Sequence, residues 1–499
     1  MKIYILYEKF KVEFYGKLIL AETLLKNFPE IEIIKLGWTR ELIFELCQIK
    51  PKKNEKIIVI NKDIWKQSEV LIDIFKEKGF FYISSHEEEY VMYSINNIKN
   101  YLNEIISKKY LLKMDNYLTL SKRTFYLMQK NMKNKKNMKI GGNLKYEYLN
   151  FAKKKNFFEK YKKKFYLITL SDSFFKHRHD YKLHHEKLKK YNLKNFKDDH
   201  YKDPTFDNAL FYLCIKNQIK FYLKLAKKFN KFEFVVRPHP PDTMHIDLYK
   251  KIFCNLKNVT VEYKKDINYW ILNCEALISG PSSVVIESIM AKKEAFLYYD
   301  NKNPIHNAIY KKHLSLKFKK NKLSNVNDFV PVFLKTKKNS LSHGKNIENY
   351  YPFTDKESKS YVDIIRNIKE KKVKNKKNFL FDYILNKIFV EIRKNRKKKN
   401  YSYKSYLKFK NKHKLSLSRL YFILKFYKNS YSYDFSNVLY KYCLGRNYHN
   451  HSKNLNSGEV DKINVKELNQ FIKIYFNNNF MNKYKSKLTN KNKDLIIRK

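Results

Sequence analysis

A polar loop motif follows a predicted strand near the middle of the chain. The tetrapeptide Arg237-Pro238-His239-Pro240 comes directly after residues 232–236, an apolar run of strand length. Arginine presents a planar fork of N–H donors to phosphate, and histidine donates a hydrogen bond or a proton. The prolines stiffen the loop and fix the direction of the histidine. Since parallel sheets bind ligands at the carboxyl ends of strands, the motif predicts an anion site. The alternative is a rigid loop with a surface histidine.

A second polar turn lies further along the same pattern. Residues 275–279 predict a strand, and Ser282 and Ser283 follow its Gly-Pro turn at the start of a predicted helix. Free backbone N–H groups and the helix dipole favour an anion there. Glu287 lies one turn inside the helix, on the face of Ser283, where it could reach a ribose hydroxyl. An ordinary helix N-cap is the alternative. The strand alternation puts both loops at one edge of the sheet.

Three acids follow an earlier predicted strand. Glu87, Glu88 and Glu89 come just after residues 80–84. Carboxylates at the end of a strand can supply a general base for an acceptor hydroxyl. The alternative is a helix start enriched in acid by the helix dipole.

A cluster of histidines and aspartates occupies part of the stretch 171–204. Its members are His177, His179, Asp180, His184, His185, Asp198, Asp199 and His200. These residue types bind metals, but none has the tight ligand spacing of a known site, so we interpret the stretch as a long polar loop and predict no metal. The sequence holds no phosphate-binding P-loop, dinucleotide fingerprint, nucleophile elbow or zinc-protease motif, and no cofactor is predicted.

The elements that carry these motifs alternate between strand and helix. In the first part the predicted strands are 2–7, 31–35, 56–61 and 80–84, with helices over 15–27 and 67–78 and a further strand near Tyr117–Leu120. In the second part the predicted strands are 165–170, 232–236, 258–263, 275–279 and 294–299, with helices over 206–228, 242–256, 267–274 and 283–291. This alternation predicts an α/β protein with parallel sheets covered on both faces.

The charge of the chain is strongly positive. Lys and Arg number 105 against 48 Asp and Glu, a formal charge of +57. Much of the lysine accompanies Asn, Ile, Tyr and Phe, all encoded by AT-rich codons, so genome composition explains part of the excess. What remains favours anionic partners such as nucleotide sugars or lipid phosphates. The five cysteines are not paired at ligand spacing, which is typical of a reducing cytoplasm. No signal peptide and no membrane span are predicted.

The C-terminal part differs in composition. Residues 371–499 hold 33 basic and 7 acidic side chains, and the run 393–399 is the densest. We predict three regions: a Rossmann-like domain over 1–155, a second Rossmann-like domain over 156–370 and a basic helical extension over 371–499. The last region would hold the protein at the cytoplasmic face of the inner membrane. An ordinary extension packed on the core is the alternative.

These landmarks, in this order, resemble the bacterial surface carbohydrate biosynthesis family. Glu8 and the segment 12–21 resemble that family's first acid and its "REFDAKLLLA" stretch. The segments 87–90 and 142–149 resemble "D-E-E-G" and "GNPRFDLL", although Tyr90 stands in place of Gly and Leu144-Lys145 in place of Pro-Arg. The "RPHP" motif is present unchanged. The later small-residue turn and "EA" helix of the family resemble Ser282-Ser283 and Glu287-Ser288.

The resemblance implies a GT-B-like fold, two Rossmann-like domains with a cleft between them, and a metal-independent glycosyltransferase of capsule or lipopolysaccharide synthesis. Similar motifs occur in sialyltransferases and Kdo transferases, which use CMP-linked acidic sugars, and in CDP-glycerol glycerophosphotransferases, so a cytidine nucleotide is favoured. Under this interpretation the catalytic residues are Glu88, Glu89 and His239. The nucleotide-binding residues are Arg237, His239, Ser282, Ser283 and Glu287, and the acceptor-binding residues are Glu8, Lys17 and Asn143.

Two rival functions remain. A polyol-phosphate transferase would use the same fold and donor loops. A protein that binds nucleic acid or membranes without catalysis would explain the positive charge. Base-reading modules are absent, so no specific nucleic acid partner is predicted. The predicted partners are a nucleotide-activated donor and a glycan or lipid-linked glycan acceptor.

Overall fold

The computed structural model describes two compact units. It covers residues 1–7, 10–38, most of 42–62, part of 72–87, 114–120, 122–131, 137–141, 143–175, 177–190, 204–300, 306, 322–331, 358–368, 465–475, 485–489 and 494–498. The first unit comprises Met1–Glu87, Ile98–Glu147 and Thr354–Lys499, and the second comprises Glu88–Asn97 and Tyr148–Phe353. The chain thus leaves the first unit within a helix near residue 147 and returns to it near residue 354.

The sheet of the first unit is built around six parallel strands. In chain order they are β1 (Lys2–Tyr7), β2 (Ile33–Trp38), β3 (Ile57–Asn61), β4 (Phe81–Ser85), β5 (Asn116–Thr119) and β6 (Met138–Ile140). Along the sheet the order is β2-β1-β3-β4-β5-β6. Strands β3 and β4 are buried at every residue, which explains why each begins with at least three apolar residues in a row. The strands predicted in this part of the chain are confirmed, and β6 is an additional one.

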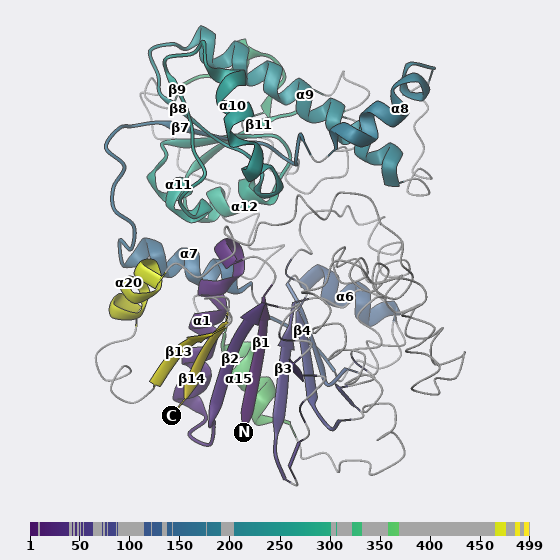
Figure 1. The fold of residues 1–499 in the computed structure, drawn as a ribbon, viewed down its shortest axis with the longest axis vertical. Helices are drawn as coiled ribbons and strands as arrows, with labels where there is room; N and C mark the ends of the chain where they lie inside the picture. Colours follow the sequence, from purple (N-terminus) through teal and green to yellow (C-terminus); the bar gives the residue numbers. More distant parts are fainter. Residues whose placement is uncertain are drawn as a thin grey trace, which may run out of the picture. The chain divides into compact units, whose positions relative to one another are not determined.

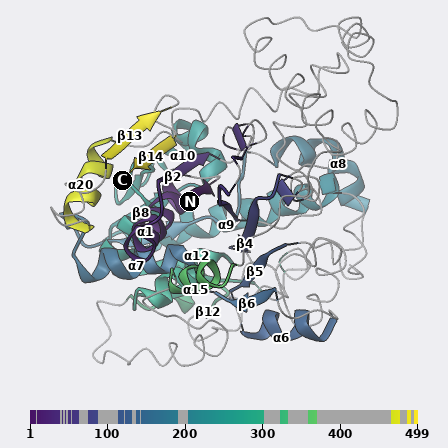
Figure 2. The same ribbon diagram turned by 90° about the horizontal axis from the view of Figure 1, so that it is seen from below.

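Two strands from the end of the chain extend this sheet. The hairpin of β13 (Lys485–Thr489) and β14 (Asp494–Arg498) pairs antiparallel with β2. Leu495 and Ile497 of β14 are 1% exposed, and the buried Asp494 pairs with Lys35 at 3.3 Å. The prediction of a purely helical extension is therefore wrong for these residues. One helix, α20 (Val465–Tyr475), lies beside the hairpin (Figure 2), and the helical extension as a whole stays a prediction. A strand with two inward apolar residues gives little signal among many lysines.

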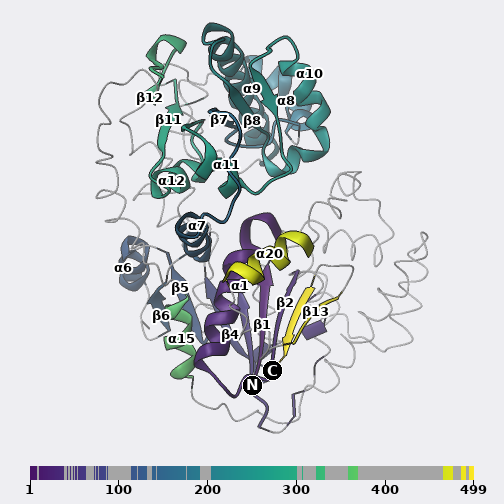
Figure 3. The same cartoon turned by 90° about the vertical axis from the view of Figure 1, so that its left-hand side faces the viewer.

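Helices of the first unit pack against the sheet and one another. They are α1 (Phe10–Asn27), α6 (Lys122–Asn131), the start of α7 (Leu144–Lys154) and α15 (Lys359–Arg366). Helices α1 and α15 lie side by side (Figure 3). Hydrogen bonds join Ser358 Oγ to Thr23 Oγ1 at 3.2 Å and Arg366 to Asn27 at 2.9 Å. The helix predicted at 355–371 is confirmed in a shorter form, and it brings residues from late in the chain to the first unit.

The second unit has a sheet of six parallel strands (Figure 1). They are β7 (Tyr166–Thr169), β8 (Phe234–Arg237), β9 (Val259–Val261), β10 (Ala276–Ser279), β11 (Glu294–Tyr298) and β12 (Lys322–Leu323), in the order β12-β11-β10-β7-β8-β9. From β7 the chain proceeds to β8 and β9, then crosses to β10 on the other side. The topological switch point, where open α/β sheets bind ligands, is thus between β7 and β10. All five strands predicted here are confirmed.

The helices of the second unit connect these strands. They are α8 (Arg178–Lys190), α9 (Pro204–Lys228), η4 (Pro240–His245), α10 (Ile246–Phe253), α11 (Ile267–Asn273) and α12 (Ser283–Met290). The prediction of a long loop over 171–204 is wrong for α8. This helix is mostly polar, and only a narrow side of it packs on α9, where the rings of Tyr181 and Tyr212 stack at 4.5 Å. Among the described residues, no helix has both the length and the apolar character needed to cross a membrane.

Two Rossmann-like units in one chain confirm the predicted fold class. The cleft between them stays a prediction.

Candidate functional site

Three loops meet at the carboxyl edge of the second sheet. Strand β7 lies between β8 and β10, and all three are parallel, so the loops that follow them emerge together. The hydroxyl of Thr169 at the end of β7 donates to Ser279 Oγ at the end of β10 at 2.8 Å. The loops at the ends of β8 and β10 carry the predicted nucleotide-binding residues. The loop after β7 belongs to the polar stretch 171–204, to which no nucleotide-binding role was assigned.

Arg237 ends β8 as a buried cation. Its Nη2 donates to the Lys265 carbonyl at 3.2 Å, and its guanidinium lies 4.6 Å from the ring centre of Tyr263. Burial lowers the pKa of Arg237, and Tyr263, Asp266 and Glu287 partly offset this effect. Its Nε has no hydrogen-bond partner among the described residues. A buried guanidinium whose Nε–H group lacks a protein acceptor is suited to bind an anionic ligand.

His239 lies two residues further along, half-buried. Its Nδ1 is 4.0 Å from Oδ1 of Asp172, in the loop after β7. The same oxygen is 3.4 Å from Nε2 of His177, which is buried and stacks on Phe211. His177, one of the histidines and aspartates noted in the stretch 171–204, therefore lies at this edge of the sheet. Among the described residues, no group of three or more metal-ligand side chains is arranged to hold a metal ion.

Asp242 fastens the β7 loop to the β8 loop. It lies in η4, is fully buried, and its backbone N–H donates to the His239 carbonyl at 2.8 Å. Its carboxylate accepts hydrogen bonds from the Ser173 hydroxyl, from two backbone N–H groups and from Tyr249 Oη at 2.6 Å. A carboxylate with this many donors holds both loops in one arrangement.

The β10 loop leads into α12. Ser282 Oγ accepts from the Val284 N–H at 3.5 Å, which confirms the N-cap interpretation for Ser282. Ser283 is the first residue of the helix and is half-buried, and Glu287 is buried and close enough to Arg237 to raise its pKa. Gly280 packs against Gln218 of α9, since a Cβ there would lie 2.4 Å from Gln218 Nε2.

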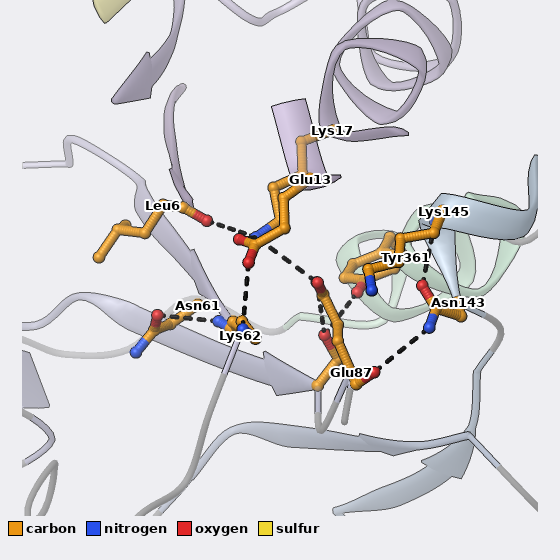
Figure 4. A network of polar contacts seen from close by, with 10 residues as sticks. Leu6, Glu13, Lys17, Asn61, Lys62, Glu87, Asn143, Lys145 and Tyr361 are labelled. Carbon is orange, nitrogen blue, oxygen red and sulfur yellow. Dashed lines mark hydrogen bonds and ion pairs between the residues drawn. The ribbon is translucent and has the colours of Figure 1, made fainter. Parts of the chain in front are cut away.

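A second cluster lies at the carboxyl edge of the first sheet (Figure 4). Four buried charges alternate in sign: Lys62, Glu13, Lys17 and Glu87. Lys62 Nζ is 3.0 Å from Glu13 Oε1, Lys17 Nζ is 3.2 Å from Glu13 Oε2, and Lys17 Nζ is 3.5 Å from Glu87 Oε1. Lys17 also donates to the Leu6 carbonyl at 2.7 Å. We call these four side chains the ion chain.

Residues from three parts of the sequence contact the end of the ion chain at Glu87. Asn143 Nδ2 donates to the Glu87 carbonyl at 3.3 Å, and Asn143 Oδ1 accepts from the Lys145 N–H at the start of α7 at 3.0 Å. Tyr361 of α15 donates to Ser85 Oγ at 3.0 Å, and Ser85 Oγ is 3.5 Å from Glu87 Oε1. The three segments that carry the family resemblance in the first unit therefore meet in one network.

Two members of the ion chain, Lys17 and Glu87, have shifted pKa values. Burial raises the pKa of Glu87, and Lys17 and Lys62 act against this rise. Burial acts to lower the pKa of Lys17, but Glu87 and Glu13 outweigh it, so the pKa of Lys17 is raised. Lys17 is thus held as a cation, whereas burial disfavours the charge of Glu87.

The structure brings some predicted residues together and leaves others outside its description. Lys17 and Asn143 share the network of Glu87, whereas Glu8, Glu88 and Glu89 lie outside the described residues. Sequence reasoning did not assign Glu13, Lys62 and Tyr361. A signal existed for two of them: Glu13 precedes Lys17 by four residues on one helix, and Lys62 follows β3 directly. Tyr361 had none, because its position depends on the late return of the chain.

Comparison with known proteins gives only distant similarities. No protein-family model matches the chain, and no curated protein sequence matches it. UDP-GlcNAc 2-epimerase from Neisseria meningitidis, bound to UDP-GlcNAc, is 11% identical with a TM-score of 0.40, over 74% of this chain and 100% of that one. The epimerase from Methanocaldococcus jannaschii, in complex with UDP-GlcNAc and UDP, is 11% identical with a TM-score of 0.43, over 73% and 99%. The pneumococcal O-GlcNAc transferase GtfA, in complex with UDP and GlcNAc, is 11% identical with a TM-score of 0.33, over 66% and 60%.

Proposed function

We propose that this chain is a metal-independent glycosyltransferase of bacterial surface-polysaccharide synthesis, using a nucleotide-activated sugar. One observation carries the proposal: Arg237 and His239 at the end of β8 and Ser283 after β10 lie at the same carboxyl edge of the second sheet, on either side of β7. A cation, an imidazole and a helix start at one sheet edge form a phosphate site without a metal.

The donor phosphate would lie against Arg237, His239 and the first N–H groups of α12. Ser282 already caps the helix, so Ser283 is the hydroxyl left to reach the phosphate. Glu287 is buried beside Arg237, and we assign it to holding that guanidinium as well as to the ribose. Fixed dipoles that meet a departing phosphate stabilise the transition state without reorganisation.

The acceptor would bind at the first unit. Asn143 and the ion chain with Lys17 form the described part of this site, and the stretch Glu87–Glu89 supplies the base. Among the described residues, the contacts of the Glu87 carboxylate go to Oε1. A carboxylate with a raised pKa is suited to accept a proton from a sugar hydroxyl.

Calorimetric titration tests the donor site. The wild type is titrated with CMP, CDP, UDP, UDP-GlcNAc and a single-stranded RNA. Saturable binding of a nucleotide supports the proposal, and the resemblance favours the cytidine nucleotides. If RNA binds and no nucleotide does, the function without catalysis replaces ours. A polyol-phosphate transferase shares the donor loops, so product analysis with candidate donors separates it from a glycosyltransferase.

The basic run 393–399 would hold the protein at the cytoplasmic face of the inner membrane. Six of its seven residues are Lys or Arg, and an anionic surface attracts each nearby basic residue by about 1 kcal/mol. Truncation at residue 370 would remove β13 and β14, so neutralising the run with glutamine is the cleaner test. Weaker co-sedimentation with anionic liposomes at low salt supports this role, and unchanged co-sedimentation refutes it.

A further inference from the structure

The loop after β7 places a carboxylate beside the candidate phosphate site. Asp172 follows β7, whereas His239 follows β8, and the two side chains lie 4.0 Å apart between Oδ1 and Nδ1. Both are between a quarter and a third exposed, so a ligand can reach them. No feature of the sequence motifs pointed to Asp172.

The buried carboxylate of Asp242 holds the loops after β7 and β8 together. Asp242 receives hydrogen bonds from the Ser173 hydroxyl and from the N–H groups of Phe174 and Phe175, which directly follow Asp172. Its own N–H donates to the carbonyl of His239. One buried carboxylate therefore sets the separation of Asp172 and His239. Asp172 is itself held, because its Oδ1 accepts from the Ser173 N–H at 2.7 Å.

We propose that Asp172 is the positioning residue of His239: its carboxylate faces Nδ1, turns Nε2 towards the donor phosphate and keeps the imidazole protonated. The inference rests on the proposed function. In the proposed reaction, the imidazolium of His239 donates a hydrogen bond to the phosphate oxygen that gains charge as the bond to the sugar breaks. His239 itself does not have to transfer a proton. An acid that orients a histidine through its other ring nitrogen fixes both the direction and the charge of the ring.

Titratable and charged groups lie on each of the three loops at this edge of the sheet. Asp172 and His177 come from the β7 loop. Arg237 and Asp242 come from the loop of His239 and η4, and Glu287 comes from α12. A second cation such as Arg237 disfavours a positive charge on the imidazole, whereas the Asp172 carboxylate, 4.0 Å from Nδ1, favours it. His177 is the rival partner, because its Nε2 is nearer to the same Asp172 oxygen, at 3.4 Å.

Histidine NMR titration of the full chain tests the inference without any assay of activity. The signal of His239 is assigned by its loss in His239→Gln. In Asp172→Asn, which keeps the size and an oxygen for the Ser173 N–H, we expect its titration midpoint to fall by about one pH unit. Asp172→Glu should restore most of that shift. Asp180→Asn is the matched control, since Asp180 lies 3.8 Å from His179 on α8 and should leave His239 unchanged.

The same variants are then titrated with the nucleotide that binds best. As pH rises from 6 to 8, we expect the affinity of Asp172→Asn to fall about fivefold more than that of the wild type, because a midpoint one unit lower loses the protonated imidazole earlier in this range. An unchanged His239 midpoint in Asp172→Asn, or a shift confined to His177, overturns the inference. If no nucleotide binds the wild type while the His239 midpoint shifts, the pair stands and the proposed function fails.

Discussion

The carboxyl edges of the two sheets carry clusters of opposite character. The ion chain of the first unit is buried, alternates in sign and pairs each charge with its neighbour. The loops of the second unit keep His239 and Ser283 half-exposed, and Arg237 keeps a donor without a partner in the described part of the chain. Closed networks mainly hold structure together, whereas open ones are available to ligands. The comparison assigns stability chiefly to the first cluster and phosphate binding to the second.

Removing Lys17 should give the largest effect on stability. Lys17→Met leaves Glu13 and Glu87 without the cation that joins them, and breaking a buried pair costs about 3–5 kcal/mol. We expect urea unfolding to show this loss while nucleotide affinity, measured on folded protein, stays unchanged. Lys227→Met on the exposed side of α9 is the control. A fall in affinity with little loss of stability would reverse the assignment of the two clusters.

Substitutions in the loops after β8 and β10 should weaken nucleotide binding and leave stability nearly unchanged. His239→Ala and Ser283→Ala each remove a polar group aimed at phosphate, so each should weaken nucleotide binding by about 1–3 kcal/mol without unfolding the protein. Calorimetry gives the affinities, and thermal unfolding checks the fold. His179→Ala and Ser324→Ala replace exposed residues of the same types. Unchanged affinity in both test variants would mean that the phosphate binds elsewhere.

The pH dependence of stability can be traced to a histidine in the second unit. His306 is fully buried, and burial lowers its pKa from 6.5 to about 4. The folded state therefore binds the proton more weakly than the unfolded state. This contribution to stability is complete above about pH 6.5 and is lost as pH falls towards 4.

At pH 5 we expect a loss of about 2 kcal/mol relative to pH 7.5 from His306 alone. Urea unfolding of the second unit at both pH values measures it. His306→Gln removes the titrating group and should reduce the difference, whereas His179→Gln should not. Equal acid sensitivity in wild type and His306→Gln would contradict the assignment.

Gly16 and Gly280 pack closely in the first and second unit, respectively, and alanine at each position would meet a different kind of neighbour. A Cβ at Gly16 would meet the backbone of Leu144 at 2.5 Å, whereas one at Gly280 would meet the end of the Gln218 side chain at 2.4 Å. Backbone cannot move aside as a side chain can, so Gly16→Ala should cost about 1 kcal/mol more than Gly280→Ala.

Gly280→Ala should instead weaken nucleotide binding, because Gln218 holds Ser171 in the β7 loop at 2.6 Å. Thermal unfolding and calorimetry on the two variants separate the effects. A larger stability loss at Gly280 would contradict this account.

Much of the fold can be predicted from the sequence. Strands buried on both faces read as apolar runs, and the alternation of strands and helices alone places the loops after β8 and β10 at one edge of a sheet. The polar helix α8 and the strand β14 were missed, because each depends on neighbours that supply its buried side. Asp172, Lys62 and Tyr361 were missed for a related reason: what they do is set by residues distant in sequence. Predicting them needs the order of the strands.

A crystal structure with the tightest-binding nucleotide tests the central claim most directly. The account predicts a phosphate group within hydrogen-bond distance of the Ser283 N–H, with Arg237 and His239 on its other sides. A nucleotide bound away from the carboxyl edge of β7, β8 and β10 would contradict it.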